Sequence, residues 1–239
     1  MKVKPSREGL TFTGYPLFHT DAVQAANYLD LNVEKLGVDL LTLSGSKIEG
    51  AGRVGVLYKK KSVPLAPIFG GGDQEQSIRP GTENWPEILK FASALRVAQE
   101  IKDKEAKRLT KLCDYFIERL RGTSASLIIN GDLENRLPNN VNVTFPKIPS
   151  DLLVLELSAR GIMCSSKSAC ESSREEGSYV IEALRNTSAR QPARPAGGDL
   201  AENVGGVRFS LGRDTQKQDI DYTVKVLAQI LQKLKKWYN

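Results

Sequence analysis

Roughly the first ninety residues alternate between short apolar runs and polar or glycine-rich stretches, a pattern typical of α/β structure. Strands are short apolar runs bounded by polar clusters, and the runs over 16–19, 38–43 and 55–58 fit that description. Residues 22–36 are expected to form a short helix between the first two strands. The Gly- and Pro-rich stretch over 64–82 is predicted to be a loop.

Helical periodicity follows from residue 88 onward. Apolar residues recur every three or four positions through 88–120, and Gly122 is expected to end this long helix. The final helix is predicted to open with a capping box formed by Thr215 and Gln218. The remaining patterns predict strands over 127–129, 141–145, 162–164 and 207–211, helices over 152–159 and 178–184, and a loop over 186–206.

The composition is that of a soluble globular protein. The 239 residues suffice for one large domain or two modest ones, with 40% hydrophobic and 26% charged residues. No apolar stretch reaches the ~18 residues of a membrane helix, and the N-terminal sequence lacks the apolar region of a signal peptide. The net charge of +6 is spread along the chain, so a nucleic-acid module, whose basic residues should gather on one face, is the weakest hypothesis.

Three cysteines and one histidine limit the chemistry further. An odd and sparse cysteine count is typical of the reducing cytoplasm. Zinc sites need several Cys or His ligands at close spacing, so we expect no metal. A Ser-His-Asp mechanism would have to use His19, and no GxSxG sequence accompanies it.

The segment Gly50-Ala-Gly52-Arg-Val-Gly55 matches the GxGxxG string of dinucleotide-binding proteins. Such a site requires a helix directly after the glycines, because the helix N-terminus holds the pyrophosphate. A strand-like run with lysines follows here instead. We therefore interpret this segment as a glycine turn.

Ser44-Gly45-Ser46-Lys47 places a lysine directly after an apolar strand and beside two hydroxyl groups. An isolated lysine of this kind is usually a solvated loop residue. A Schiff-base cofactor site nevertheless needs this combination, an amine at a strand end with hydroxyls for a nearby phosphate. Asp21, followed by Gln24, stands at the end of the preceding strand, and a carboxylate beside a pyridine nitrogen keeps that nitrogen protonated.

The three cysteines differ in their surroundings. Cys170 ends the polar segment Cys164-Ser-Ser-Lys-Ser-Ala-Cys170, which favours an exposed and reactive thiol. Cys113 on an apolar helix face and Cys164 on a predicted strand are interpreted as core residues. Arg208 is an unusual residue for a buried strand and suggests bidentate capture of a carboxylate, with an internal ion pair as the alternative.

Six motifs occur together in one order along the chain. They are Phe18-His-Thr-Asp21-Ala-Val-Gln24, Ser44-Gly-Ser-Lys47, Arg79-Pro-Gly-Thr82, Leu137-Pro-Asn-Asn-Val-Asn, Ser165-Ser-Lys-Ser-Ala-Cys170 and Val207-Arg-Phe-Ser-Leu-Gly-Arg213. Together they resemble the cysteine desulfurases of the NifS/IscS type, which are class V aminotransferase-like enzymes dependent on pyridoxal 5'-phosphate. The resemblance implies an α/β fold of the type I pyridoxal-phosphate-dependent transferases (aspartate aminotransferase-like). Residues 1–95 would then be part of the large cofactor-binding domain, and 96–239 a small α+β domain with the cysteine loop.

The resemblance also implies the catalytic chemistry. Lys47 would form the Schiff base with the cofactor and, once displaced by L-cysteine, remove the Cα proton. Cys170 would attack the substrate sulfur and keep it as a persulfide, which leaves alanine. Arg208 would bind the substrate carboxylate.

The cofactor contacts follow from the same motifs. Asp21 would pair with the pyridine nitrogen, and Gln24 with the ring hydroxyl. Ser44 and Ser46 would hold the phosphate, joined by Thr82 from the other subunit of a homodimer. The sulfur would pass to an acceptor protein, such as an iron–sulfur scaffold, in the cytoplasm, and no nucleic acid or membrane partner is expected.

Two departures from the family keep alternatives open. Ser46 stands where these enzymes usually have a histidine, and the N-terminal part of the family's chain has no counterpart, so the sequence resembles the C-terminal part of a desulfurase. The alternative is therefore a non-catalytic, truncated fragment that retains dimer or partner-binding surfaces. A selenocysteine lyase or another class V lyase is a third hypothesis, which the Ser-Ala-Cys loop disfavours.

Overall fold

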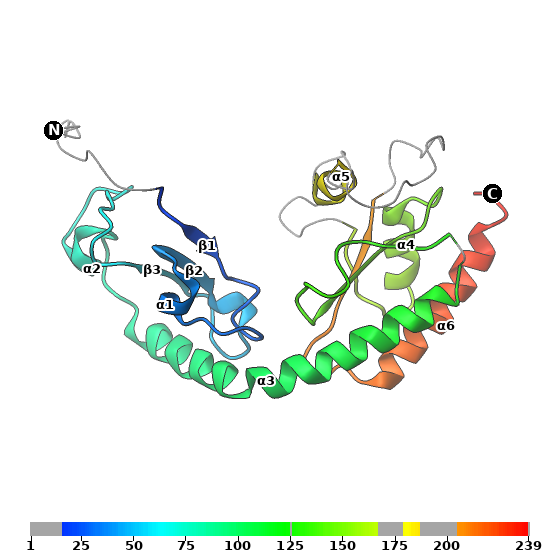
Figure 1. Ribbon diagram of the computed structural model, residues 1–239, viewed down its shortest axis with the longest axis horizontal. Helices are drawn as coiled ribbons and strands as arrows, with labels where there is room; N and C mark the ends of the chain where they lie inside the picture. Colours follow the sequence, from blue (N-terminus) through cyan, green and yellow to red (C-terminus); the bar gives the residue numbers. More distant parts are fainter. Residues whose placement is uncertain (1–15, 125, 167–178, 187–204, 239) are drawn as a thin grey trace. The chain divides into compact units, whose positions relative to one another are not determined.

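The computed structural model describes residues 16–124, 126–166, 179–186 and 205–238. The chain forms two compact units, Met1–Asp103 and Lys104–Asn239, which are described separately (Figure 1). Among the described residues, no helix is long and apolar enough to cross a membrane. The sequence-based division into domains at residues 95 and 96 stays a prediction.

The first unit contains a three-stranded sheet with the order β1-β2-β3. Strand β1 pairs in parallel with β2, and β2 pairs antiparallel with β3. The predicted loop over 64–82 is interrupted only by α2, in which Glu75, Gln76 and Ser77 have positive φ angles. The elements of this unit are β1 (His19–Asp21), α1 (Val33–Leu36), β2 (Leu40–Ser44), η1 (Gly45–Lys47), β3 (Gly55–Lys59), α2 (Gln74–Ser77) and the first part of α3 (Trp85–Arg121).

Alternation along β2 creates the core of the first unit. Leu41 and Leu43 are buried, whereas Leu40, Thr42 and Ser44 are partly exposed on the other face. The buried pair belongs to an apolar cluster with Phe91 and Ala98 of α3. Full burial of a leucine or phenylalanine side chain contributes about 1.5–3 kcal/mol. The end of β2, which leads to the candidate lysine Lys47, therefore lies against a packed apolar core.

Asp39 fastens the start of the sheet. Its side chain is only 4% exposed; Oδ1 pairs with Lys60 Nζ at 2.9 Å, and Oδ2 accepts a hydrogen bond from the Phe18 amide at 2.9 Å. The amide hydrogen bond, followed by the Lys60 ammonium, lowers the pKa of this carboxyl below its usual value of 3.8. The ionised carboxylate thus joins the segments that enter β1 and β2 to the one that leaves β3.

We expect Asp39→Asn to lower the melting temperature of the protein at neutral pH, because the amide cannot form the ion pair with Lys60. A carboxyl with a depressed pKa stabilises the folded state above pH 3.8 and loses that contribution as the pH falls through its folded-state pKa. The difference between variant and wild type should therefore shrink in acid. Thermal unfolding from neutral pH to about pH 3 measures this, with the exposed Asp103→Asn as control. A gap that stays constant over this range contradicts the assignment.

The second unit contains a three-stranded antiparallel sheet with the order β4-β5-β6. Val141 and Val143 of β5 and Val207 and Phe209 of β6 point into the core, and the Phe209 ring meets Phe116 of α3 edge to face at 5.1 Å. The opposite face carries polar side chains, Arg208 among them. The elements are the rest of α3, β4 (Ile128–Ile129), β5 (Asn140–Thr144), α4 (Ser150–Ser158), α5 (Tyr179–Asn186), β6 (Val207–Ser210) and α6 (Lys217–Leu234).

The expected helix over 22–36 is wrong for most of its length, since only α1 is helical and the preceding residues form turns. Local side-chain hydrogen bonds explain the difference. Asp30 Oδ1 accepts from the Asn32 amide at 3.0 Å, and Asn32 Oδ1 accepts from the amides of Glu34 and Lys35 at 3.0 Å, which caps α1 at its first turn. Short polar side chains of this kind compete with helical hydrogen bonding.

Two expectations for the second unit are also wrong. Residues 162–164 form no strand; only an isolated bridge joins Ser165 to Arg208, and Cys164 is half-buried rather than a core residue. The capping box of α6 uses Gln216 and Asp219, one position later than predicted.

Candidate active site

The carboxyl ends of the parallel strands β1 and β2 bring the predicted cofactor residues to one edge of the sheet. Asp21 is the last residue of β1 and lies opposite Thr42 of β2; Ser44 ends β2 two positions further on, and Ser46 and Lys47 follow in η1. The Asp21 side chain is exposed, and its Oδ1 accepts a hydrogen bond from the Val23 amide at 3.0 Å. In α/β sheets, ligands bind outside the carboxyl ends of the strands. A carboxylate, two hydroxyls and an amine are therefore available at such an edge.

The turn after β2 is built around Gly45. A Cβ atom at this position would lie 2.7 Å from the Gly52 carbonyl oxygen and 2.9 Å from that of Ala51, so no larger residue fits without a backbone shift. The Gly45 amide donates to the Val54 carbonyl at 2.7 Å. The glycine segment over 50–55 thus forms the support of the turn and is followed by β3, which confirms the interpretation as a glycine turn.

The polar groups of this turn face solvent. The hydroxyls of Ser44 and Ser46 lie 2.9 Å apart and share a hydrogen bond, and the Lys47 side chain is exposed. Two neighbouring hydroxyls can donate to the oxygens of one phosphate group, and an exposed amine at the same turn can react with a carbonyl. The turn therefore has the donor set that a phosphorylated aldehyde cofactor needs.

Asn27 is a residue of this site that the sequence reasoning missed. Its Nδ2 donates to the backbone carbonyl of Lys47 at 2.6 Å, across twenty positions of chain, and so ties the turn after β1 to the turn after β2. Its Oδ1 is buried and has no hydrogen-bond partner among the described residues. The only sequence signal was an Asn within the apolar stretch that was predicted to be helical.

Gln24 and Thr82 lie in the same unit as Lys47. Gln24 is exposed in the turn that follows β1, and Thr82 is exposed in the segment between α2 and α3. The turn before Thr82 is closed by Gly81, whose amide donates to Gln74 Oε1 at 3.1 Å. Their contacts with a cofactor stay predictions.

Arg208 belongs to the second unit, on the polar face of β6. Its backbone pairs with that of Ser165 through hydrogen bonds of 2.7 and 3.1 Å. The half-buried side chain lines a cavity of about 370 Å³ together with Arg136 and several amide side chains. Arg136 donates from Nη2 to the Asn140 carbonyl, while its Nε and Nη1 are buried without a partner among the described residues. The lining also includes the Asp132 carboxylate, so the two guanidinium groups leave the cavity with one net positive charge, which suits a carboxylate ligand.

The two described cysteines are poor nucleophiles at neutral pH. Burial raises the thiol pKa of Cys113 to about 11, and that of Cys164 to about 11. The Cys113 thiol also donates to the Pro138 carbonyl at 2.8 Å, as expected for a core residue. Because the thiolate is the reactive form, neither residue suits sulfur transfer. Cys170 lies outside the described residues.

Comparison with known families identifies the class of protein. Residues 15–223 match the family model for aminotransferase class-V, and the chain belongs to this family. The similar sequences include a cysteine desulfurase IscS of Dictyoglomus turgidum, 40% identical over 218 residues. An IscS of Methanosarcina thermophila is likewise 40% identical over 218 residues. Each alignment covers 91% of this chain, but 52% and 51% of the relatives, so the chain spans about half of their length.

Solved structures agree with the sequence relatives. A NifS-like protein superposes with a TM-score of 0.75 at 31% identity, covering 91% of this chain and 53% of that one. A NifS-like protein from Rickettsia africae gives 0.73 at 26% identity, covering 90% and 54%. The predicted α/β fold class and the resemblance to the NifS/IscS type are thereby confirmed.

Proposed function

We propose that the protein carries out, in whole or in part, the pyridoxal-phosphate-dependent conversion of L-cysteine to L-alanine, with the sulfur transferred to Cys170 as a persulfide. The observation that carries this proposal is the parallel pairing of β1 with β2, which brings Asp21 and the Ser44–Lys47 turn to one sheet edge. The likeness to proteins named cysteine desulfurase supports it.

The residues at this edge fit pyridoxal phosphate. Asp21 would hold a proton on the ring nitrogen, Gln24 would donate to the ring hydroxyl oxygen, and Ser44 and Ser46 would donate to the phosphate. Thr82 would complete the phosphate contacts from the other subunit of a homodimer, a role that its exposed position permits. When bound, the cofactor supplies an electron sink for the pair released as the substrate Cα loses its proton.

The chain's own residues would handle the proton and the sulfur. Lys47 Nζ would take the Cα proton, because its side chain is exposed at the strand end while its backbone carbonyl is held by Asn27. Arg208 would bind the substrate carboxylate. The Cys170 thiolate would attack the substrate sulfur, so that a sulfur–sulfur bond forms as the carbon–sulfur bond breaks and alanine leaves with a hydrogen in place of its thiol.

The destination of the sulfur is part of the proposal. A persulfide on Cys170 would pass to an acceptor protein in the cytoplasm, for iron–sulfur cluster assembly or for the thiolation of a cofactor or tRNA. The raised thiol pKa of Cys113 and Cys164 supports Cys170 as the carrier, because neither of the other cysteines is readily ionised.

A non-catalytic binding fragment is the second candidate function. Leu17, Phe18 and Leu57, on or beside the sheet of the first unit, are 41%, 53% and 46% exposed. Exposed apolar side chains can contact another chain. This candidate predicts partner binding without retention of the cofactor.

The first experiment mixes the purified chain with pyridoxal phosphate, removes excess cofactor by desalting and records the absorption spectrum. We expect a retained absorption band that is distinct from that of free cofactor, followed by alanine formation on addition of L-cysteine. L-Serine, which has a hydroxyl in place of the thiol, is the control substrate and should form no alanine. A chain that keeps no cofactor and forms no alanine would contradict the enzymatic proposal and favour the fragment.

A further inference from the structure

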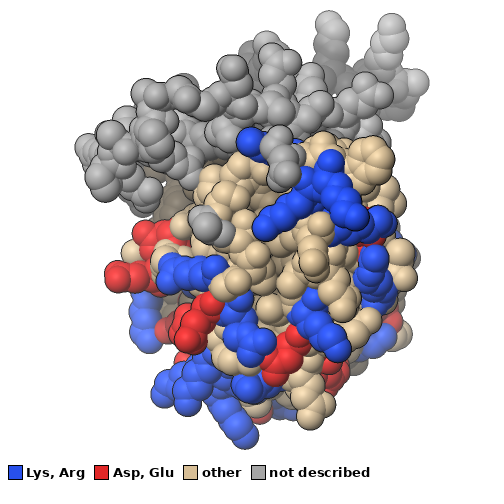
Figure 2. All heavy atoms as spheres, turned by 90° about the vertical axis from the view of Figure 1, so that its right-hand side faces the viewer, with Lys and Arg blue, Asp and Glu red and all other residues tan. Residues whose placement is uncertain are grey.

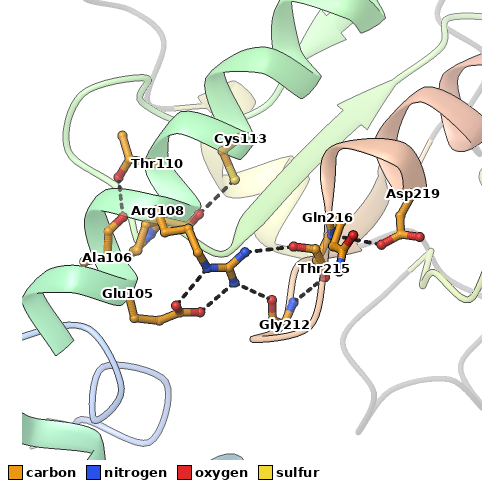
Figure 3. Close-up of polar contacts among 10 residues, drawn as sticks. Glu105, Ala106, Arg108, Thr110, Cys113, Gly212, Thr215, Gln216 and Asp219 are labelled. Atoms are coloured by element: carbon orange, nitrogen blue, oxygen red, sulfur yellow. Dashed lines mark hydrogen bonds and ion pairs between the residues drawn. The ribbon is translucent and has the colours of Figure 1, made fainter. Parts of the chain in front are cut away.

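A groove of about 680 Å³ lies in the second unit, between α3 and the start of α6. Arg108 of α3 reaches across to the loop before α6, as Figure 3 shows, and forms one wall. The lining residues are Lys104, Lys107, Arg108, Lys111, Leu112, Tyr115, Thr215, Gln216 and Lys217. Five of them are cationic and none is acidic. None of them belongs to the candidate active site.

Arg108 is a structural member of this wall. Its guanidinium binds both oxygens of Glu105 at 2.8 and 2.9 Å and donates to the carbonyls of Thr215 at 2.8 Å and Gly212 at 3.0 Å. The Glu105 carboxylate neutralises its charge. The two walls are thus fixed to one another, and the positive charge available to a ligand comes from the lysines.

Lys104, Lys107 and Lys111 supply that charge. All three are exposed, and none has an ion-pair or hydrogen-bond partner among the described residues. Spacings of three and four positions place them along one face of α3, about one helical turn apart. Lys217 adds a fourth ammonium from the opposite wall, where it pairs weakly with Asp221 at 3.8 Å.

The floor of the groove is apolar and ordered. Leu112 and Tyr115 are half-buried between the two walls. The Tyr115 hydroxyl donates to Asp221 and accepts from Arg119 at 3.1 Å, and Lys217 Nζ lies 4.6 Å from the ring centroid. The Arg119 guanidinium carbon also lies 5.7 Å from this centroid, so cationic groups lie over the ring, and Leu112 provides the apolar part of the floor.

The lysines and the floor of the groove together indicate what kind of ligand would bind. Carboxylates spaced along a peptide would match the lysines, and a leucine or an aromatic side chain between them would match the floor. A nucleic acid follows a longer basic track. Figure 2 shows one face of the chain, on which lysine and arginine side chains lie among aspartate and glutamate side chains.

We propose that this groove binds an acidic segment of a partner protein. Carboxylates of the segment pair with Lys104, Lys107 and Lys111, and an apolar side chain of the segment packs on Leu112. The inference is independent of the proposed desulfurase activity, since it uses no residue of that site.

The test measures binding of a fluorescent synthetic peptide of glutamate and leucine residues by fluorescence anisotropy, with the full chain at moderate salt. The double variant Lys107→Glu, Lys111→Glu is expected to weaken binding by about tenfold or more, because two charge pairs are lost and the reversed charges repel the peptide. The control is Lys225→Glu, Lys236→Glu, which makes the same change in net charge at exposed positions outside the groove. It should change the affinity by less than about twofold.

Further measurements test for misfolding, for non-specific attraction and for binding of other polyanions. Circular dichroism checks that both variants are folded, and a peptide with glutamine in place of glutamate should bind far more weakly. Equal losses in the groove and control variants would show non-specific attraction and overturn the proposal. The proposal is likewise overturned if the peptide does not bind, or if a single-stranded RNA or inorganic polyphosphate binds the groove more tightly than the peptide.

Discussion

Replacement of Lys47 by alanine is expected to abolish the retention of pyridoxal phosphate and to reduce alanine formation from L-cysteine by at least about 10³-fold. The amine is the proposed attachment point of the cofactor and the proposed base for the Cα proton, and removal of a catalytic base alone costs about 10²–10⁴-fold in rate. The fold around the turn should survive, because Asn27 holds the backbone carbonyl of residue 47 rather than its side chain.

Absorption after desalting and quantification of alanine measure the two effects. The matched control is Lys61→Ala, which removes an exposed lysine just past β3. This control should keep both the absorption band and the activity. A Lys47→Ala protein that keeps the same band after desalting would show that another group holds the cofactor, and it would remove Lys47 from the site.

Cys170→Ala is expected to separate cofactor binding from sulfur transfer. The variant should keep the absorption band and lose persulfide formation entirely, with a fall in sulfide release of about 10³-fold or more, since no other nucleophile replaces the thiolate. Cys113→Ala and Cys164→Ala serve as controls. Burial raises the pKa of both thiols to about 11, so few of them are ionised at neutral pH and neither is expected to carry sulfur.

Mass spectrometry after brief exposure to L-cysteine locates the persulfide as one added sulfur atom on a cysteine-containing peptide. We expect the addition on the peptide with Cys170 in the wild type and on none in Cys170→Ala. An added sulfur on Cys113 or Cys164 in that variant, with sulfide release unchanged, would disprove the assignment.

Sequence patterns located β2, β3, β5 and β6 because their signal is local, but they failed for 162–164, and the predicted run over 16–19 shares only its last residue with β1. Leu41 and Leu43 alternate with polar neighbours and are buried, as period-two patterning requires. The same reasoning failed for 22–36, where Ala22 and Ala26 are buried within turns rather than on a helix face. Thr215 failed as a cap because its polar groups have other partners, one local and one distant in the chain. Its hydroxyl accepts from the Gly212 amide and its carbonyl from Arg108, which lies more than a hundred positions away in the chain.

Some residues of the candidate site could likewise be predicted from the sequence, and others could not. Asp21, Ser44, Ser46 and Lys47 were predictable because two short motifs at the ends of neighbouring strands carry them. Asn27 was missed, since its hydrogen bond to the Lys47 carbonyl depends on how two turns meet in space. The basic groove was missed as well, because the spacing of Lys104, Lys107 and Lys111 acquires meaning only when Arg108 fixes the start of α6 opposite α3.

The two sheets differ in how far apart along the chain their paired strands lie. In the first unit every strand pairs with its neighbour in sequence, and residues 19–59 hold the whole β1-β2-β3 sheet. In the second unit, β5 pairs with β6, so that Val141 lies opposite Phe209. Arg108 of α3 contacts Thr215 in the loop before α6, which is also distant along the chain. Closing long loops slows folding. The turn that carries Lys47 thus depends on strand pairing within residues 19–59, whereas the sheet that carries Arg208 requires β6, which follows β5 only after residues 145–206.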